Sequence, residues 1–196
     1  MGTHFLYNSM KHRLRWIIGS GFAIVLVMTT IAPVYAYKYE KQKWPTNSAG
    51  FYLDIAGWDP ALIQGPASTW NNAGSPFRFK LKGHNVYKPN DGYSTIGRYT
   101  LTDTDAIAVT KGQPGSTVTE IDTIFNMKYG WGCCAESDLY DVRNVMTHEF
   151  GHWLVLGDLY NIFTDINKTM YGLIGKGETK KRSLHQDDIN GINYIY

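Results

Sequence analysis

One short stretch, residues 148–158, constrains this chain more than any other feature of its sequence. His148 and His152 are four residues apart, so on a helix their side chains lie on one face, one turn apart. Two neutral imidazoles at that separation can bind one Zn²⁺, and Glu149 projects beside them. Asp158 follows six residues after the second histidine and is the best candidate for a third ligand. The stretch therefore predicts a metal site on a helix that ends in a turn.

A catalytic zinc ion takes about three protein ligands and keeps one position open for water. His148, His152 and Asp158 would supply that ligand set. Glu149 would act as general base and acid, taking a proton from a water whose pKa the metal lowers toward about 7. This chemistry is typical of metalloproteases. The alternatives are that the motif arose by chance in an unrelated helix, and that Asp158 is a capping or loop carboxylate.

The composition favours a secreted, loop-rich domain. Of the 196 residues, 43% are hydrophobic, 14% are aromatic and only 18% are charged, which is enough apolar material for one globular domain. Without residues 1–36, 16 basic and 17 acidic side chains remain, so the net charge changes from +2 to −1. The sequence carries no basic patch that would indicate a nucleic-acid partner.

The N-terminus resembles an export signal. A mostly apolar run, residues 16–31, precedes a small-x-small cleavage pattern that ends at Ala36. The positive charges before the run are Lys11, Arg13 and Arg15. We therefore expect residues 1–36 to be a signal peptide and residues 37–196 to be a secreted domain without stable membrane association. The alternative is an uncleaved anchor, although 16 residues is short for a bilayer span of about 20.

The two cysteines, Cys133 and Cys134, are adjacent in the sequence. Their Cα atoms must lie about 3.8 Å apart, below the usual range for a disulfide, so a bond between them would be strained. They do not form a disulfide framework despite the predicted export. A free or strained pair in a loop is favoured over metal ligation.

Alternation of apolar and polar residues, together with turn residues, predicts most of the strands. They are expected at residues 51–55, 77–81, 106–110 and 118–125. Residues 84–99 are expected to form a loop. Asp59 and Pro60 favour a helix start, and this helix should reach Asn72 with a kink or a restart at Pro66.

Two further helices are predicted in the second half of the chain. Asp141 is a plausible cap for the helix that carries the metal motif. We expect this helix to stop near Leu156, with Gly157 in the left-handed turn. Ser183 and Gln186 have the spacing of a capping box that opens the last helix.

The motif resembles the metzincin zinc site, HExxHxxGxxH/D, and especially its matrixin version. An aspartate as third ligand resembles the snapalysin variant. Met170-Tyr171 is similar to the Met-turn, the loop under the zinc, and residues 184–192 resemble the matrixin C-terminal helix. Trp44-Pro45 is similar to the start of a matrixin catalytic domain. The resemblance thus covers nearly all of residues 37–196.

This resemblance implies an α+β fold with a twisted, mixed five-stranded sheet, an active-site helix and a small C-terminal subdomain containing the Met-turn and a final helix. It implies a zinc-dependent endopeptidase, expected to be a monomer, that binds a protein or peptide substrate along an edge strand. Residues 106–111, with Val109, are the candidate edge. Met170 would support the zinc site, and Tyr171 and Leu173 would line the pocket for the residue after the cut.

The sequence departs from the family pattern at Val155, which stands where the family has glycine three residues after the second histidine. Either the helix runs on and Gly157 turns instead, or Val155 is strained. The scarcity of other histidines argues against a second, structural zinc. Calcium could be held at Asp103, Asp105 or Asp122, but solvated loop or strand-end aspartates are the favoured account.

Three rival interpretations remain open on the sequence. The first is a non-catalytic zinc-binding protein on the same fold, for which Val155 is the only support. The second is a membrane-tethered protease, if Ala36 is not the cleavage site. The third is a gluzincin with Glu178 as the third ligand, which ranks below Asp158 because Glu178 lies in a glycine- and lysine-rich stretch that is a poor helix.

Overall fold

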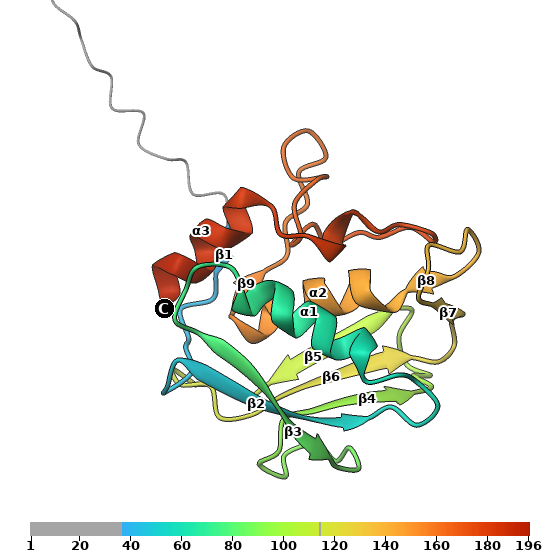
Figure 1. Ribbon diagram of the computed structural model, residues 1–196, viewed down its shortest axis with the longest axis horizontal. Helices are drawn as coiled ribbons and strands as arrows, with labels where there is room; N and C mark the ends of the chain where they lie inside the picture. The colour runs from blue at the N-terminus through green and yellow to red at the C-terminus, as the bar shows by residue number, and fades with distance from the viewer. Residues whose placement is uncertain (1–36, 114) are drawn as a thin grey trace, which may run out of the picture. The chain divides into compact units, whose positions relative to one another are not determined.

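A mixed five-stranded sheet lies under the helices (Figure 1), as the resemblance predicts. The computed structural model describes residues 37–113 and 115–196, so the predicted signal segment lies outside the described residues. The strand order is β3-β2-β4-β6-β5. The strands are β2 (Ser48–Asp54), β3 (Arg78–His84), β4 (Thr95–Tyr99), β5 (Ala108–Gly112) and β6 (Ile121–Asn126). All pairs are parallel except β5 with β6, and β5 forms one edge.

Strand β4 was not predicted, because its residues fall in the segment expected to be a loop. Its sequence, TIGRY, has no alternation and contains a glycine. Thr95, Ile96 and Gly97 are nevertheless buried, and the strand pairs with β2 on one side and β6 on the other. Pairing on both sides, rather than local propensity, makes this segment a strand.

Two helices, α1 (Ala61–Asn71) and α2 (Val142–Trp153), lie on the same side of the sheet (Figure 1). Trp70 Nε1 on α1 donates to the carbonyl of Thr147 on α2 at 2.8 Å. The helix α1 continues through Pro66 instead of beginning again there, and Pro66, Ala67 and Trp70 are all buried. Among the described residues, no helix is both long and apolar enough to cross a membrane.

Aromatic packing fixes α2 against the sheet. The Phe79 and Phe150 ring centroids are 4.3 Å apart, and Phe51 packs edge-on against Phe150 at 5.6 Å. Trp153 is fully buried, and its Nε1 donates to Thr123 Oγ1 on β6 at 2.8 Å. Trp44 Nε1 donates to the Trp153 carbonyl at 2.7 Å. Burial of these rings therefore sets the rotation of the helix that carries the metal motif.

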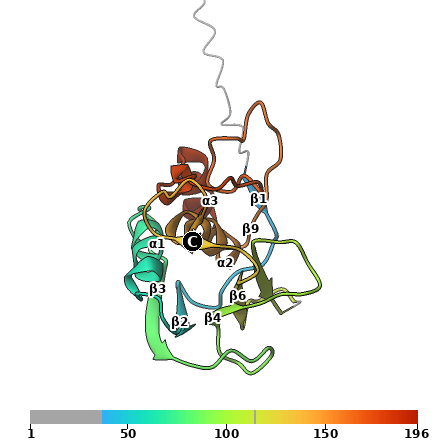
Figure 2. The same cartoon turned by 90° about the vertical axis from the view of Figure 1, so that its right-hand side faces the viewer.

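The C-terminal segment covers α2 on the side away from the sheet (Figures 1 and 2). It contains η1 (Lys180–Arg182) and α3 (Gln186–Ile195). The predicted cap Ser183 was wrong: His185 caps α3, its Nδ1 accepting from Asp187 N at 3.1 Å, while Asp188 accepts from His185 N. Two small sheets pair β1 (Lys38–Tyr39) with β9 (Leu156–Gly157) and β7 (Trp131–Gly132) with β8 (Tyr140–Asp141).

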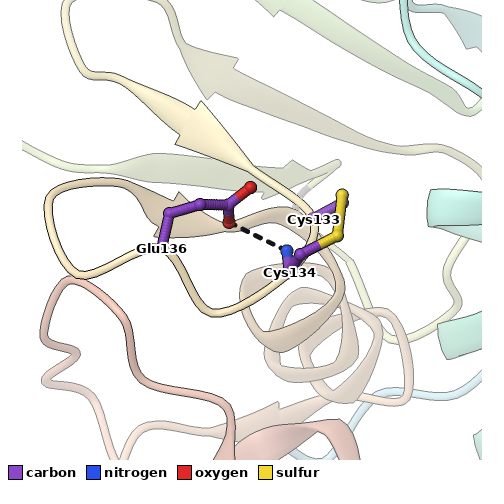
Figure 3. Close-up of side chains that lie close together, drawn as sticks. All are labelled: Cys133, Cys134 and Glu136. Carbon is purple, nitrogen blue, oxygen red and sulfur yellow. Dashed lines mark hydrogen bonds between the residues drawn. A yellow bond between two sulfur atoms is a disulfide. The ribbon is translucent and has the colours of Figure 1, made fainter.

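The adjacent cysteines form a disulfide in the loop between β7 and β8 (Figure 3). Cys134 N donates to Glu136 Oε2 at 2.9 Å, so the carboxylate stabilises the turn that holds the pair. Arg182 of η1 donates to the Cys133 carbonyl at 2.5 Å and to both carboxylate oxygens of Asp141. The pair is therefore a local link in a loop, not part of a disulfide framework.

Asp122 on β6 is a buried carboxylate, and we expect it to destabilise the fold at alkaline pH. Burial, and then the charge of nearby Glu120, raise its pKa to about 7, although Thr95 N donates to it at 2.8 Å. A raised folded-state pKa contributes stability that is present below the unfolded pKa of about 4 and is lost as pH rises through 7. Asp122→Asn should therefore raise the Tm at pH 8 and change it little at pH 4.

Thermal unfolding at the two pH values, with exposed Asp103→Asn as control, measures this effect. A lower Tm for Asp122→Asn at pH 8 would contradict it. Repeating the pH 8 measurement with calcium tests the calcium alternative, because an ion bound by Asp122 would make the substitution destabilising.

Candidate active site

The structure brings the three predicted ligands together. Asp141 caps α2 as predicted, its carboxylate accepting from Asn144 N at 2.8 Å. His148 Nε2 and His152 Nε2 lie 3.2 Å and 3.6 Å from Asp158 Oδ1. One ligand atom from each residue lies within 4.8 Å of the others. Ligands about 2.0–2.2 Å from a tetrahedral zinc are about 3.3–3.6 Å apart, so these separations suit one ion.

Hydrogen bonds on the far side of each imidazole orient it toward the same point. His148 Nδ1 lies 2.8 Å from the carbonyl of Thr169, and His152 Nδ1 lies 2.8 Å from the carbonyl of Leu156. Since a carbonyl only accepts, Nδ1 carries the proton, and the neutral ring presents the Nε2 lone pair to a metal. Asp158 Oδ1 is buried without a hydrogen-bond partner among the described residues. The donor set therefore fits zinc.

At neutral pH, His152 and Asp158 are in the protonation states that bind a metal. Burial, and then the neighbouring His148, lower the pKa of His152 and favour its neutral form. Burial acts to raise the pKa of Asp158, but its contacts with His148, His152 and Tyr160 outweigh burial and hold the pKa at about 2. A neutral imidazole and an ionised carboxylate are the forms that bind zinc.

The helix ends earlier than predicted, and Val155 takes the turn. The last helical residue is Trp153, and Val155 has φ of +59°, the left-handed conformation expected for Gly157. Val155 N donates to the His152 carbonyl at 2.9 Å, and its own carbonyl accepts from Glu40 N at 3.0 Å. A β-branched residue there costs about 1–3 kcal/mol, which burial of its side chain in the core offsets.

Gly157 lies where the N-terminal strand approaches. It pairs with Lys38 of β1, and a Cβ at this position would overlap the side chains of Glu40 and Lys38. The N-terminal strand can therefore lie directly against the segment that leads to Asp158. The turn at Val155 and the pairing of β1 with β9 together return the chain to the metal ligands.

Met170, predicted to support the site, is buried against the helix that carries the metal motif. It is 1% exposed, and a Cβ at Gly151 would overlap its sulfur atom. The glycine inside the HExxH motif thus allows the helix to lie on Met170. The preceding residue, Thr169, supplies the carbonyl that orients His148.

Asp188 on α3 holds the Met-turn, a role that sequence reasoning missed. It is fully buried, and its carboxylate accepts from Thr169 N at 3.0 Å, Met170 N at 3.3 Å and His185 N at 3.1 Å. Burial raises the pKa of Asp188, and these backbone donors act in the opposite direction. The final helix is therefore connected to the metal site through Asp188, Thr169 and His148.

A chain of side-chain hydrogen bonds holds Glu149. Thr110 Oγ1 on β5 donates to Glu149 Oε2 at 2.6 Å, and it lies 2.6 Å from Thr123 Oγ1 on β6. Since the carboxylate only accepts, Thr110 must accept its other bond from Thr123, which in turn accepts from Trp153. Neither threonine was predicted, because the link between β5 and α2 spans 39 residues.

The ligands and Glu149 border a cleft of about 1210 Å³ that runs between β5 and the segment after the Met-turn. Val109 and Thr110 line one side, and Leu173 and Ile174 line another. Val109 and Leu173 are thus placed as predicted. Tyr171 is not: its side chain is 5% exposed and does not line the cleft, because the chain turns so that Gly172 and the residues after it face the cavity.

The other predicted or rival ligands lie outside the site. Glu178 accepts from Gly175 N at 3.3 Å and pairs with Lys180 at 3.6 Å, which does not support the gluzincin interpretation. Among residues 37–113 and 115–196, the clusters able to hold a metal comprise this site and the Cys133, Cys134 and Glu136 group. They do not include the aspartates considered for calcium.

A helix presenting two imidazoles to a nearby carboxylate, beside a sheet edge and a cleft, defines a metalloprotease-type zinc site. In sequence, the family model described as Matrixin matches residues 73–196, more than half of the chain. The chain belongs to the matrixin family of zinc metalloproteases.

No curated protein matches the chain in sequence. Among solved structures, it is similar to high choriolytic enzyme 1, a hatching enzyme zinc-protease from the medaka fish Oryzias latipes. The sequence identity is 13%, the TM-score is 0.43, and the alignment covers 78% of this chain and 92% of that chain.

Proposed function

We propose that this protein is a secreted zinc-dependent endopeptidase. His148, His152 and Asp158 would hold the zinc, and Glu149 would be the general base and acid. One ligand atom from each of these three residues lies within 4.8 Å of the others, next to Glu149 in one open cleft. This arrangement is the main support for the proposal. Export rests on the predicted signal peptide, residues 1–36, and a monomer acting on protein or peptide substrates is expected.

When bound, zinc would lower the pKa of a water molecule and polarise the scissile carbonyl. The Glu149 carboxylate would take a proton from the attacking water and return it to the leaving amine. Thr110 keeps the carboxylate oriented toward the cleft by donating to its other oxygen. The edge strand β5, including Val109, would bind the substrate backbone in extended form, because its outer hydrogen-bonding groups have no neighbouring strand among the described residues. The pocket beside Leu173 would receive the residue after the cut.

The proposal is tested by casein hydrolysis and zinc analysis on the same purified sample. We expect about one zinc per chain, loss of hydrolysis with a chelator and recovery on adding zinc. Bound zinc without hydrolysis of any unfolded protein would favour the non-catalytic interpretation instead. Recovery of activity from the medium, with an N-terminus at Tyr37, would separate the secreted enzyme from a membrane-tethered one.

Thr110→Val is expected to lower kcat/KM about tenfold while zinc content stays the same. Valine has the shape of threonine but cannot donate to Glu149, and a hydrogen bond to a charged group contributes roughly 1.5–3 kcal/mol. Steady-state kinetics on a fluorogenic peptide measures the change. Thr110→Ser keeps the hydroxyl and serves as control. Unchanged kinetics in the valine variant would show that Thr110 does not position Glu149.

A further inference from the structure

A buried lysine lies at the wall of the cleft. Lys181 in η1 is 2% exposed, and its backbone N donates to Asn144 Oδ1 on α2 at 2.6 Å. It lines the cleft together with Val145, His148 and Leu173. Its position is therefore fixed by α2, close to the metal site but outside the ligand set.

Among the described residues, the hydrogen bonds of the Lys181 ammonium group go to backbone carbonyls, and the group also lies 5.9 Å from the centre of the Tyr171 ring. Its Nζ donates to the Leu173 carbonyl at 2.8 Å and to the Tyr171 carbonyl. An ammonium group has three donors, so these bonds use two of them. Within the described ranges no carboxylate lies within 4.0 Å of this Nζ, whereas the other buried lysine, Lys168, pairs with Asp165 at 3.0 Å and Asp187 at 3.2 Å. Lysine is rarely buried without such a partner.

We propose that Lys181 is a specificity-determining residue that selects an acidic side chain, aspartate or glutamate, in the substrate residue that enters the cleft beside Leu173. The inference rests on the proposed endopeptidase function, in which this is the residue after the cut. A substrate carboxylate would accept the remaining ammonium proton and complete the ion pair that the free protein lacks. A neutral amide of the same shape would leave that charge without a counter-ion.

The charge on Lys181 provides an independent readout. Burial lowers the pKa of Lys181 to about 8. Four charged groups nearby also affect this pKa: Glu178, Lys180, Asp158 and Glu149. Lys180 also acts to lower the pKa, and the three carboxylates act to raise it. The group is charged well below pH 8 and neutral well above it. The preference for an acidic residue should therefore be present at pH 6.5 and lost at pH 9.5.

The experiment uses a mixture of peptides generated from a cell extract by another protease, with the cleavage sites read by mass spectrometry. We expect acidic residues after the cut to exceed their amide counterparts about tenfold at pH 6.5 and to equal them at pH 9.5. A peptide pair that differs only by Glu or Gln at this position then gives the ratio of kcat/KM. Because both peptides share the same catalytic groups, titration of those groups cancels in the ratio.

Lys181→Met should abolish the preference while the glutamine peptide is still cleaved. Lys180→Met is the matched control, because Lys180 is an exposed neighbour and should leave the ratio unchanged. If Lys181→Met does not fold, the Glu/Gln ratio of the unmodified enzyme at pH 6.5 and pH 9.5 tests the inference instead. Equal cleavage of both peptides at pH 6.5 would overturn the inference about Lys181 but not the proposed endopeptidase function. Cleavage of neither, with zinc bound, would overturn the proposed endopeptidase and the inference with it.

Discussion

Glu149→Gln is expected to reduce kcat/KM for peptide hydrolysis by about 10²–10⁴-fold while the protein keeps its fold and its zinc. The amide cannot take a proton from water or return one to the leaving amine. It can still accept the hydrogen bond from Thr110, which reaches Glu149 Oε2 at 2.6 Å, so the side chain should keep its place. Glu149 is not one of the three clustered ligands, so metal binding should not depend on it.

The measurement combines kinetics on a fluorogenic peptide with zinc analysis of the same preparation. His152→Ala is the matched comparison from the same helix, because it removes a ligand and should lose zinc and activity together. Hydrolysis by Glu149→Gln at the rate of the unmodified enzyme would remove Glu149 from its proposed role. Loss of zinc in Glu149→Gln would instead indicate that the carboxylate contributes to metal binding.

Asp188→Ala is expected to lower the free energy of unfolding by about 3–4 kcal/mol, although Asp188 contacts neither a ligand side chain nor the cleft. The substitution would leave the buried backbone N–H groups of Thr169 and Met170 without their acceptor, and His185 N would lose one of its two acceptors. For a chain of this size the Tm should fall by roughly 10 °C. Chemical and thermal unfolding measure both quantities.

Zinc affinity should fall in the same variant, by about 10–100-fold, because the Thr169 carbonyl that orients His148 belongs to the segment that Asp188 holds. Gln186→Ala is the control, since Gln186 is exposed on the same helix and bonds only to Asn190. Zinc competition with a chelating dye gives the affinity of each variant. An Asp188→Ala protein with the stability and zinc affinity of the control would contradict the connection between α3 and the metal site.

Much of the site was predictable from sequence because its chemistry is local. The four-residue spacing of His148 and His152 on a helix places both rings on one face, and Asp141 caps that helix through a bond to a residue three positions away. The edge position of β5 followed from the family resemblance, and the structure confirms it. The signal peptide remains a prediction, because residues 1–36 lie outside the described part of the chain.

Two mistaken predictions, the turn at Gly157 and the loop in place of β4, share one physical cause, which is that local preference was outweighed by distant contacts. Val155 is a poor residue for a left-handed turn, yet it takes that conformation because its side chain is buried and its carbonyl bonds to Glu40. Gly157 is better suited to such a turn but pairs with Lys38 where β1 approaches. The strand β4 likewise exists because β2 and β6 pair with it on both sides.

By itself, the sequence determined which residues can bind the metal and which carboxylate stands beside them, since helical spacing alone brings the histidines together. Only the tertiary structure decided which groups orient them: the Thr169 carbonyl behind His148, Thr110 against Glu149, and Asp188 beneath the Met-turn. These contacts join positions 19 to 39 residues apart. The packing of α2 between the sheet and the C-terminal segment determines which groups make these contacts. The spacing of residues within a single helix or strand does not indicate them.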